Sequence, residues 1–213
     1  MGRFKANTTE KPGTFIIPGD KLPERHYGYF SVRWSVDNAL GMMEMIMAME
    51  SGLETTSLVT RIKANPWIAM VQVQTFYISM YLAYAEVILN VSERTLAEMN
   101  IGFLDGLKAL RSPDEKPYDT KILSFMQQRT QDYRLAIITE LNAKVELGVL
   151  DFTGGPTCDI LTRSLSIMYS KDPTKPDTFD TLESQRLVLL FGHQPAKFMQ
   201  MLKNDLHISY LVA

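Results

Sequence analysis

The fold prediction depends on the stretch Tyr29-Phe30-Ser31-Val32-Arg33-Trp34-Ser35, in which apolar and polar side chains alternate strictly after the first residue. Apolar residues occupy positions 30, 32 and 34, and polar residues occupy positions 31, 33 and 35. Because successive side chains of a strand point to opposite faces, this period of two predicts a half-buried strand. From Val36 onward the period becomes helical, with Met43 and Met47 on one side, and Ser51-Gly52 ends this helix.

The rest of the chain predicts helices separated by loops that contain proline or glycine. Helices are expected at about 36–50, 57–63, 66–90, 93–110, 120–147, 157–170, 179–191 and 196–206. The stretch from Trp67 to Ser92 carries one charge, Glu86, and is long enough to span a bilayer. Its polar residues, among them Gln72 and Gln74, favour a buried central helix instead. We expect Glu86 to lie at the rim of this helix, or to be paired if it is buried.

The composition excludes several classes of site. The one cysteine, Cys158, excludes an internal disulfide and a cysteine-based zinc site. The three histidines form no pair at the spacing of metal ligands. The chain contains no phosphate-binding loop, dinucleotide-binding glycine pattern, hydrolase nucleophile elbow or HExxH zinc motif. We therefore expect neither an enzyme nor a bound cofactor.

The net charge of −2 is divided unevenly along the 213 residues. Residues 1–35 hold six basic and three acidic side chains, a balance of +3, so the remainder holds 16 basic and 21 acidic ones, a balance of −5. A basic front on an acidic body indicates an anionic partner. The first 14 residues are polar and lack the apolar region of a signal peptide, which predicts a cytoplasmic protein.

A single strand leaves its backbone donors and acceptors without partners. Two arrangements would supply them. Two copies of the chain could pair their strands at 29–35 in an antiparallel ribbon, or the strand could form a hairpin with residues 14–17 of the same chain. The first arrangement predicts a homodimer or a higher homo-oligomer.

The order strand, helix, tight turn, helix over residues 28–64 resembles the ribbon-helix-helix fold of dimeric DNA-binding proteins. The resemblance implies a mainly α protein, with an N-terminal ribbon-helix-helix module followed by an α-helical domain. It implies that the ribbon enters the major groove of double-stranded DNA, where outward side chains read base edges. On this sequence the outward side chains are Tyr29, Ser31 and Arg33.

The same resemblance implies contacts with the DNA backbone. The start of the second helix, at Thr55 and Thr56, would offer backbone N–H groups to a phosphate. The basic arm would add phosphate or minor-groove contacts through Lys21 and Arg25.

A second resemblance extends further along the chain. A strand-helix segment, the helix start Asn65-Pro66-Trp67-Ile68-Ala69 and a helical remainder together resemble the AcaB-type regulators encoded by conjugative plasmids and integrating conjugative elements. This resemblance implies a dimeric transcriptional activator whose helical region is an oligomerisation or RNA-polymerase-facing extension. The expected organisation is a basic flexible arm at 1–27, a ribbon-helix-helix DNA-binding module at 28–64 and an α-helical extension at 65–213.

Two hypotheses for function follow. The first is a sequence-specific DNA-binding regulator that acts as a dimer. The second is a non-enzymatic helical adaptor or scaffold, such as a secretion or phage-assembly component, that docks a partner through a methionine-rich face. The methionines in question are Met42, Met43, Met45, Met47 and Met49. They are expected to fill the core and a dimer interface, with a ligand groove as the alternative.

Overall fold

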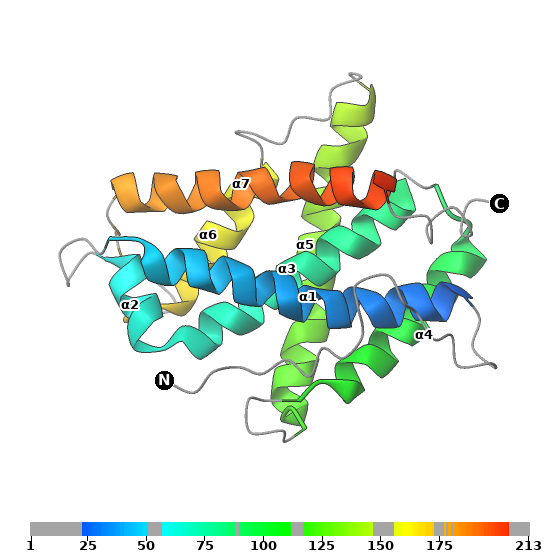
Figure 1. Ribbon diagram of the computed structural model, residues 1–213, viewed down its shortest axis with the longest axis horizontal. Coiled ribbons are helices and arrows are strands. Elements are labelled where there is room, and N and C mark those ends of the chain that lie inside the picture. Colours follow the sequence, from blue (N-terminus) through cyan, green and yellow to red (C-terminus); the bar gives the residue numbers. More distant parts are fainter. Residues whose placement is uncertain are drawn as a thin grey trace.

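The computed structural model describes residues 23–50, 57–87, 90–111, 117–146, 156–172, 177, 179 and 181–204. In these ranges the chain forms seven helices and no strand (Figure 1). The helices are α1 (Pro23–Ala48), α2 (Leu58–Ala64), α3 (Pro66–Val87), α4 (Glu93–Ala109), α5 (Thr120–Glu146), α6 (Pro156–Met168) and α7 (Thr181–Asn204). One isolated antiparallel bridge joins Arg111 to Pro117.

The expected strand at 29–35 is wrong, because these residues lie inside α1. Phe30 and Trp34, one helical turn apart, both pack edge-on against Tyr81 of α3, with ring centroids 6.1 and 4.8 Å away. Ser31 and Ser35 are buried, and their hydroxyls donate to carbonyl oxygens three residues earlier in the same helix. A helix that is covered on more than one side buries apolar and small polar residues alike. A buried helix therefore accounts for the alternation, and the prediction of a ribbon-helix-helix fold with a paired ribbon is wrong.

The prediction of a buried central helix is confirmed by α3. Every residue from Ala69 to Ala85 is buried, and the helix packs against α1 on one side and α5 on another. Asn65 ends α2, and α3 then starts at Pro66, whose fixed φ and missing N–H suit the first turn of a helix. No helix in the described ranges is long and apolar enough to cross a membrane.

Glycines allow α1 and α4 to approach each other closely, and this is the largest contact of α1 with another helix. A Cβ atom on Gly28 would lie 1.9 Å from the carbonyl oxygen of Met99, and one on Gly102 would lie 1.8 Å from the carbonyl oxygen of Arg25. No other residue type fits at either position without moving a helix backbone. An ion pair between Arg25 and Glu98 closes the same interface, with 2.5 Å between Nε and Oε2.

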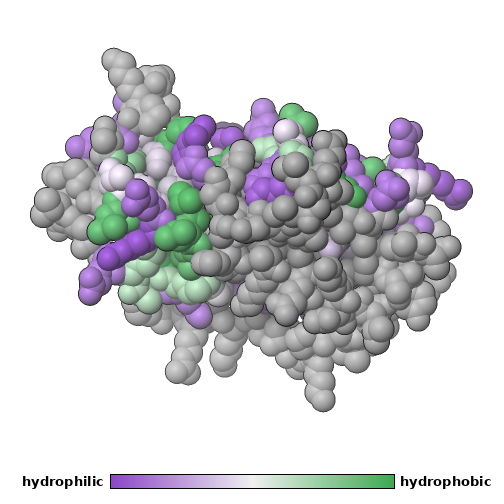
Figure 2. Space-filling view, turned by 90° about the horizontal axis from the view of Figure 1, so that it is seen from above, coloured by the Kyte–Doolittle hydropathy of each residue, from purple (hydrophilic) through white to green (hydrophobic). Residues whose placement is uncertain are grey.

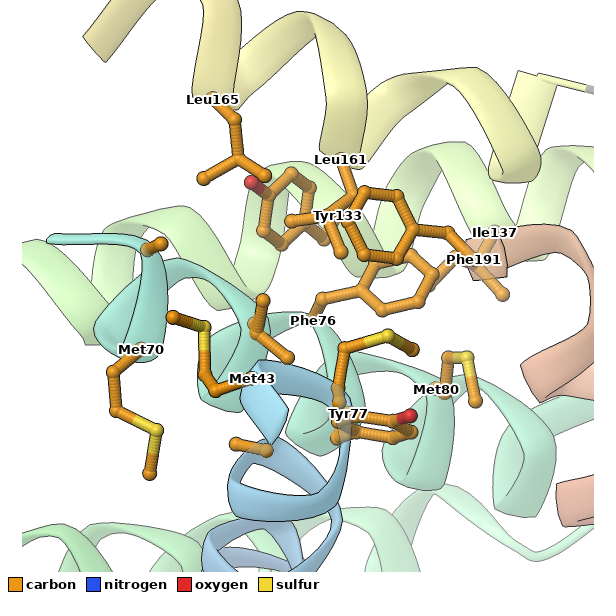
Figure 3. Packing of buried hydrophobic residues seen from close by; sticks show 14 of the residues in the cluster. Met43, Met70, Phe76, Tyr77, Met80, Tyr133, Ile137, Leu161, Leu165 and Phe191 are labelled. Carbon is orange, nitrogen blue, oxygen red and sulfur yellow. The ribbon is translucent and has the colours of Figure 1, made fainter. Parts of the chain in front are cut away.

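Figure 3 shows the core where α3, α5, α6 and α7 meet. Phe76 of α3 lies edge-on to Tyr133 of α5, with ring centroids 5.8 Å apart, and Leu161 and Phe191 pack nearby (Figure 3). The Tyr133 hydroxyl donates to Oε1 of Gln72 at 2.7 Å. Burial raises the pKa of Tyr133 to about 12, so the hydroxyl stays protonated and remains a hydrogen-bond donor at neutral pH.

Two buried glutamates bind the N-termini of helices that are distant in sequence. Glu183 of α7 accepts hydrogen bonds from the Leu58 N–H at 2.6 Å and the Ser57 hydroxyl at 2.7 Å, at the start of α2. Glu140 of α5 accepts a hydrogen bond from the Thr157 N–H at 2.6 Å, at the start of α6. Free backbone N–H groups and the helix dipole both favour a carboxylate at such a position. These contacts fix α2 to α7 and α6 to α5.

Candidate interaction surface

The structure describes four of the seven residues predicted to bind DNA. Lys21, Thr55 and Thr56 lie outside the described residues. The other four lie on α1. Arg25, Tyr29 and Arg33 follow one another at intervals of four residues along one side of the helix, and Ser31 lies on a different side. Of these, Ser31 is buried and Arg25 is paired with Glu98, whereas Arg33 is exposed. Without the ribbon geometry on which they were based, their roles in DNA binding stay predictions.

Charges on the described surface are mixed in sign. Several basic side chains have an acidic partner one turn away on their own helix: Arg163 with Asp159, Arg129 with Asp132, and Lys108 with Asp105. On α1, Arg33 lies four residues before Asp37, and the guanidinium acts to lower the pKa of that carboxyl while partial burial, the larger effect, raises it. Such a mixture differs from the continuous basic stripe that marks most nucleic-acid-binding surfaces.

The methionine run of α1 divides into an inner and an outer set. Met42 and Met43 are buried in the core beside α3, which confirms the expected core packing for these two residues. Met45 and Met47 point outward and retain 40% and 36% of their accessible surface. The two sets arise because side chains on a helix advance by about 100° per residue, so neighbouring methionines face different ways.

We define the methionine face as the outward residues Gly41, Glu44, Met45, Met47 and Ala48 of α1. On a helix these positions fall within one arc, with Met45 and Met47 at its two borders and Glu44, Ala48 and Gly41 between them. A Cβ atom on Gly41 would meet no atom within 4 Å, so this glycine is not needed for packing within the fold. The methionine face is thus a partly apolar strip on the outer side of α1.

Other exposed apolar side chains are more dispersed. Leu182 and Leu189 lie seven residues apart on one side of α7, with Arg186 between them, and Leu135 on α5 is 69% exposed. In Figure 2 the described part of the face seen from above shows apolar and polar surface interleaved rather than one continuous apolar area. Isolated exposed leucines are common on proteins and indicate no site by themselves.

The described residues offer little for chemistry. No group of three or more His, Cys, Asp or Glu side chains among them is placed to hold a metal ion. Burial raises the pKa values of Tyr118 and Tyr169 to about 12, and both hydroxyls therefore stay protonated at neutral pH. The Tyr169 hydroxyl accepts a hydrogen bond from the Ala69 N–H at 3.0 Å and donates to the Asn65 carbonyl, which is a structural role at the start of α3.

Glu86 follows the sequence prediction. It lies partly exposed at the end of α3, and both Nε and Nη2 of Arg134 donate to its Oε2, at 2.9 and 2.6 Å. The pair joins α3 to α5 at the rim of the core, so neither group is available as a free catalytic acid or base.

Sequence reasoning identified the methionines as a group but did not distinguish the outward ones from the inward ones. The missing information was which sides of α1 pack against α3 and α4, because these contacts decide which positions of the helix are buried. A scan against protein-family models finds no matching family, and searches of curated proteins and of solved structures find no matching protein.

Proposed function

We propose that this chain is a helical adaptor protein, without catalytic activity of its own, that binds a partner through the methionine face of α1. The observation that carries the proposal is the outward placement of Met45 and Met47 on a helix that is otherwise packed against α3 and α4. Methionine is flexible and polarizable, which suits it to surfaces that adapt to a partner. A cytoplasmic location belongs to the same proposal.

Gly41 supports the proposal in a second way. A glycine inside a helix costs about 1 kcal/mol relative to alanine. At Gly28 of the same helix that cost is offset by the close approach of α4, whereas the space beside Gly41 is open. A small residue on the methionine face leaves room for another helix to approach α1 closely, as α4 does at Gly28.

Site-specific cross-linking tests the proposal. A photoreactive residue is placed at position 47 in the full chain, with position 135 as the control because Leu135 is also an exposed apolar residue. In cells of the organism that makes this protein, we expect position 47 to give a discrete cross-linked product, and position 135 not to give that product. The cross-linked protein is then identified, purified and titrated against the chain by calorimetry.

The titration decides whether the contact is specific. Truncating an exposed apolar residue at a binding site typically costs about 1–2 kcal/mol, so Met45→Ala together with Met47→Ala should weaken binding at least tenfold. Leu135→Ala should leave the affinity unchanged. Equal affinities for all variants would contradict the proposal. Salt-dependent binding of the chain to duplex DNA would favour the regulator hypothesis instead.

A further inference from the structure

Methionines that are close neighbours on α1 differ sharply in their access to solvent. Met42 and Met43 retain 1% and 7% of their accessible surface, whereas Met45 and Met47 are exposed. Among the methionines whose side chains the structure describes, the one other exposed residue is Met168, at the end of α6. The buried ones outside α1 are Met70, Met80, Met99 and Met126. Exposure is therefore concentrated on the methionine face, with Met168 as an isolated case.

Exposure decides which methionine sulfurs a peroxide can oxidise. A lone pair of the thioether sulfur attacks one oxygen of hydrogen peroxide, an S–O bond forms, the O–O bond breaks, and the other oxygen leaves as water. The sulfur is oxidised by two electrons and the peroxide is reduced by two. The product, methionine sulfoxide, is polar where the thioether was apolar. A buried sulfur meets peroxide only when the surrounding structure opens, and this opening costs free energy and slows the reaction.

We propose that Met45 and Met47 are a reversible modification site, at which oxidation by hydrogen peroxide makes the methionine face polar and releases its partner. The release rests on the proposed function, whereas the modification does not. Neither side chain belongs to the hydrophobic core clusters, so their oxidation leaves the fold intact, whereas a sulfoxide at Met42 would place a polar oxygen in the core. Methionine sulfoxide reductases reverse the step: two thiols are oxidised to a disulfide, and the sulfoxide oxygen leaves as water.

Mass spectrometry of the full chain tests the modification. The folded protein is exposed to dilute hydrogen peroxide, the reaction is stopped with free methionine at several times, and the chain is digested with trypsin. No Lys or Arg lies between Arg33 and Arg61, so one peptide carries all five methionines of the run, and its fragmentation locates each added oxygen. Met45 and Met47 should be oxidised about tenfold faster than Met42 and Met43, because the latter require opening of the fold. In concentrated urea the four rates should become equal.

Calorimetry with the partner identified by cross-linking tests the release. Oxidation confined to the exposed methionines should weaken binding about tenfold, and treatment with the reductases should restore it. The double variant Met45→Leu with Met47→Leu keeps apolar side chains of similar volume but has no sulfur at these positions. It should bind the partner and no longer respond to peroxide. Met168→Leu, the matched control, should leave the response to peroxide as it is in the wild type.

Several outcomes would overturn the inference. Oxidation of Met45 and Met47 as slow as that of Met42 and Met43 in the folded chain would show that the methionine face is not open to peroxide. Unchanged affinity after oxidation at both positions would reject the release of the partner, and so would a double leucine variant that still responds to peroxide. If cross-linking identifies no partner, the proposed function fails, and the oxidation rates still decide whether the modification site exists.

Discussion

Replacing Gly102 with alanine tests the packing of α1 on α4 at its closest point. The added methyl carbon would lie 1.8 Å from the carbonyl oxygen of Arg25, whereas real Cβ atoms stay at least 3.0 Å from such neighbours. The two backbones must therefore separate by roughly 1.2 Å, the difference between these two distances. No side-chain rotation relieves the clash, because the atoms met first belong to the backbone of α1.

The cost follows from the extent of the interface. A gap of this size removes a quarter to a half or more of the dispersion energy of the contacts that it opens, and overpacking costs about 1–3 kcal/mol. We expect a cost of about 3 kcal/mol, because α4 is the most extensive neighbour of α1. Alanine returns about 1 kcal/mol as the better helix former, which leaves a net loss of about 2 kcal/mol. For a chain of this size the Tm should fall by about 4–8 °C.

Gly41→Ala is the matched control, since it makes the same substitution in the same kind of element. No atom lies within 4 Å of the position that its methyl group would take, so only the gain in helix propensity remains. The Tm should rise by about 2–4 °C. Gly106→Ala should lower the Tm, but by less than Gly102→Ala, because its methyl carbon would meet the side chain of Val32 at 2.9 Å.

Scanning calorimetry of the purified variants measures the order of stabilities, with circular dichroism as a check on helix content. The reasoning fails if Gly102→Ala melts at or above the wild-type temperature. If Gly102→Ala does not fold, the order of Gly41→Ala, wild type and Gly106→Ala still tests it. A lower Tm for Gly41→Ala would show that the methionine face is already covered in solution.

Three further predictions concern the core and its borders. Gln74 is fully buried and neither amide atom has a hydrogen-bond partner among the described residues, so Gln74→Met should raise the free energy of unfolding by about 1 kcal/mol or more in a urea titration. Glu183→Gln should lower the free energy of unfolding by about 1–2 kcal/mol, because the negative charge at the start of α2 is lost. As a control, Arg186→Gln on the exposed side of α7 should leave the free energy of unfolding unchanged. Asp177 accepts a hydrogen bond from Arg61, which lowers the pKa of its carboxyl below 3.8. That stabilisation is present above pH 4 and is lost as the pH falls through the lowered pKa, so the Tm difference between wild type and Asp177→Asn should be present at pH 6 and shrink as the pH falls below 4.

The central helix could be predicted from sequence because its signal is local. The pair Asn65-Pro66 marks its start, and its apolar length with uncharged polar residues indicates burial. Ser92 likewise caps α4, where its hydroxyl accepts a hydrogen bond from the Thr95 N–H. These features depend on neighbours within a few residues.

The strand prediction failed because the spacing of apolar residues in a short segment depends on how many of its sides are buried. Residues 29–35 have α3 on one side and α4 on another, so apolar positions appear at intervals of two as well as four. The longer repeat through Tyr27, Phe30, Trp34 and Asn38 fits a helix, but Tyr27 and Asn38 lie outside the alternating segment 29–35. The methionine face could not be separated from the core for the same reason, since the register of α1 is set by its contacts.

The capping carboxylates could not be predicted at all. Glu183 lies 125 residues from Leu58, and Glu140 lies 17 residues from Thr157, and nothing in the local pattern identifies either as a ligand for a helix end. Only the folded arrangement brings each carboxylate to its backbone donors.

The contact between Glu183 and the start of α2 affects the order in which parts of the chain fold during translation. The ribosome produces α2 long before residue 183, and a helix of 7 residues is too short to be stable alone in water. Until α7 emerges, the Leu58 N–H lacks the carboxylate oxygen that accepts its hydrogen bond. We therefore expect the start of α2 to reach its final contacts only after α7 has been translated.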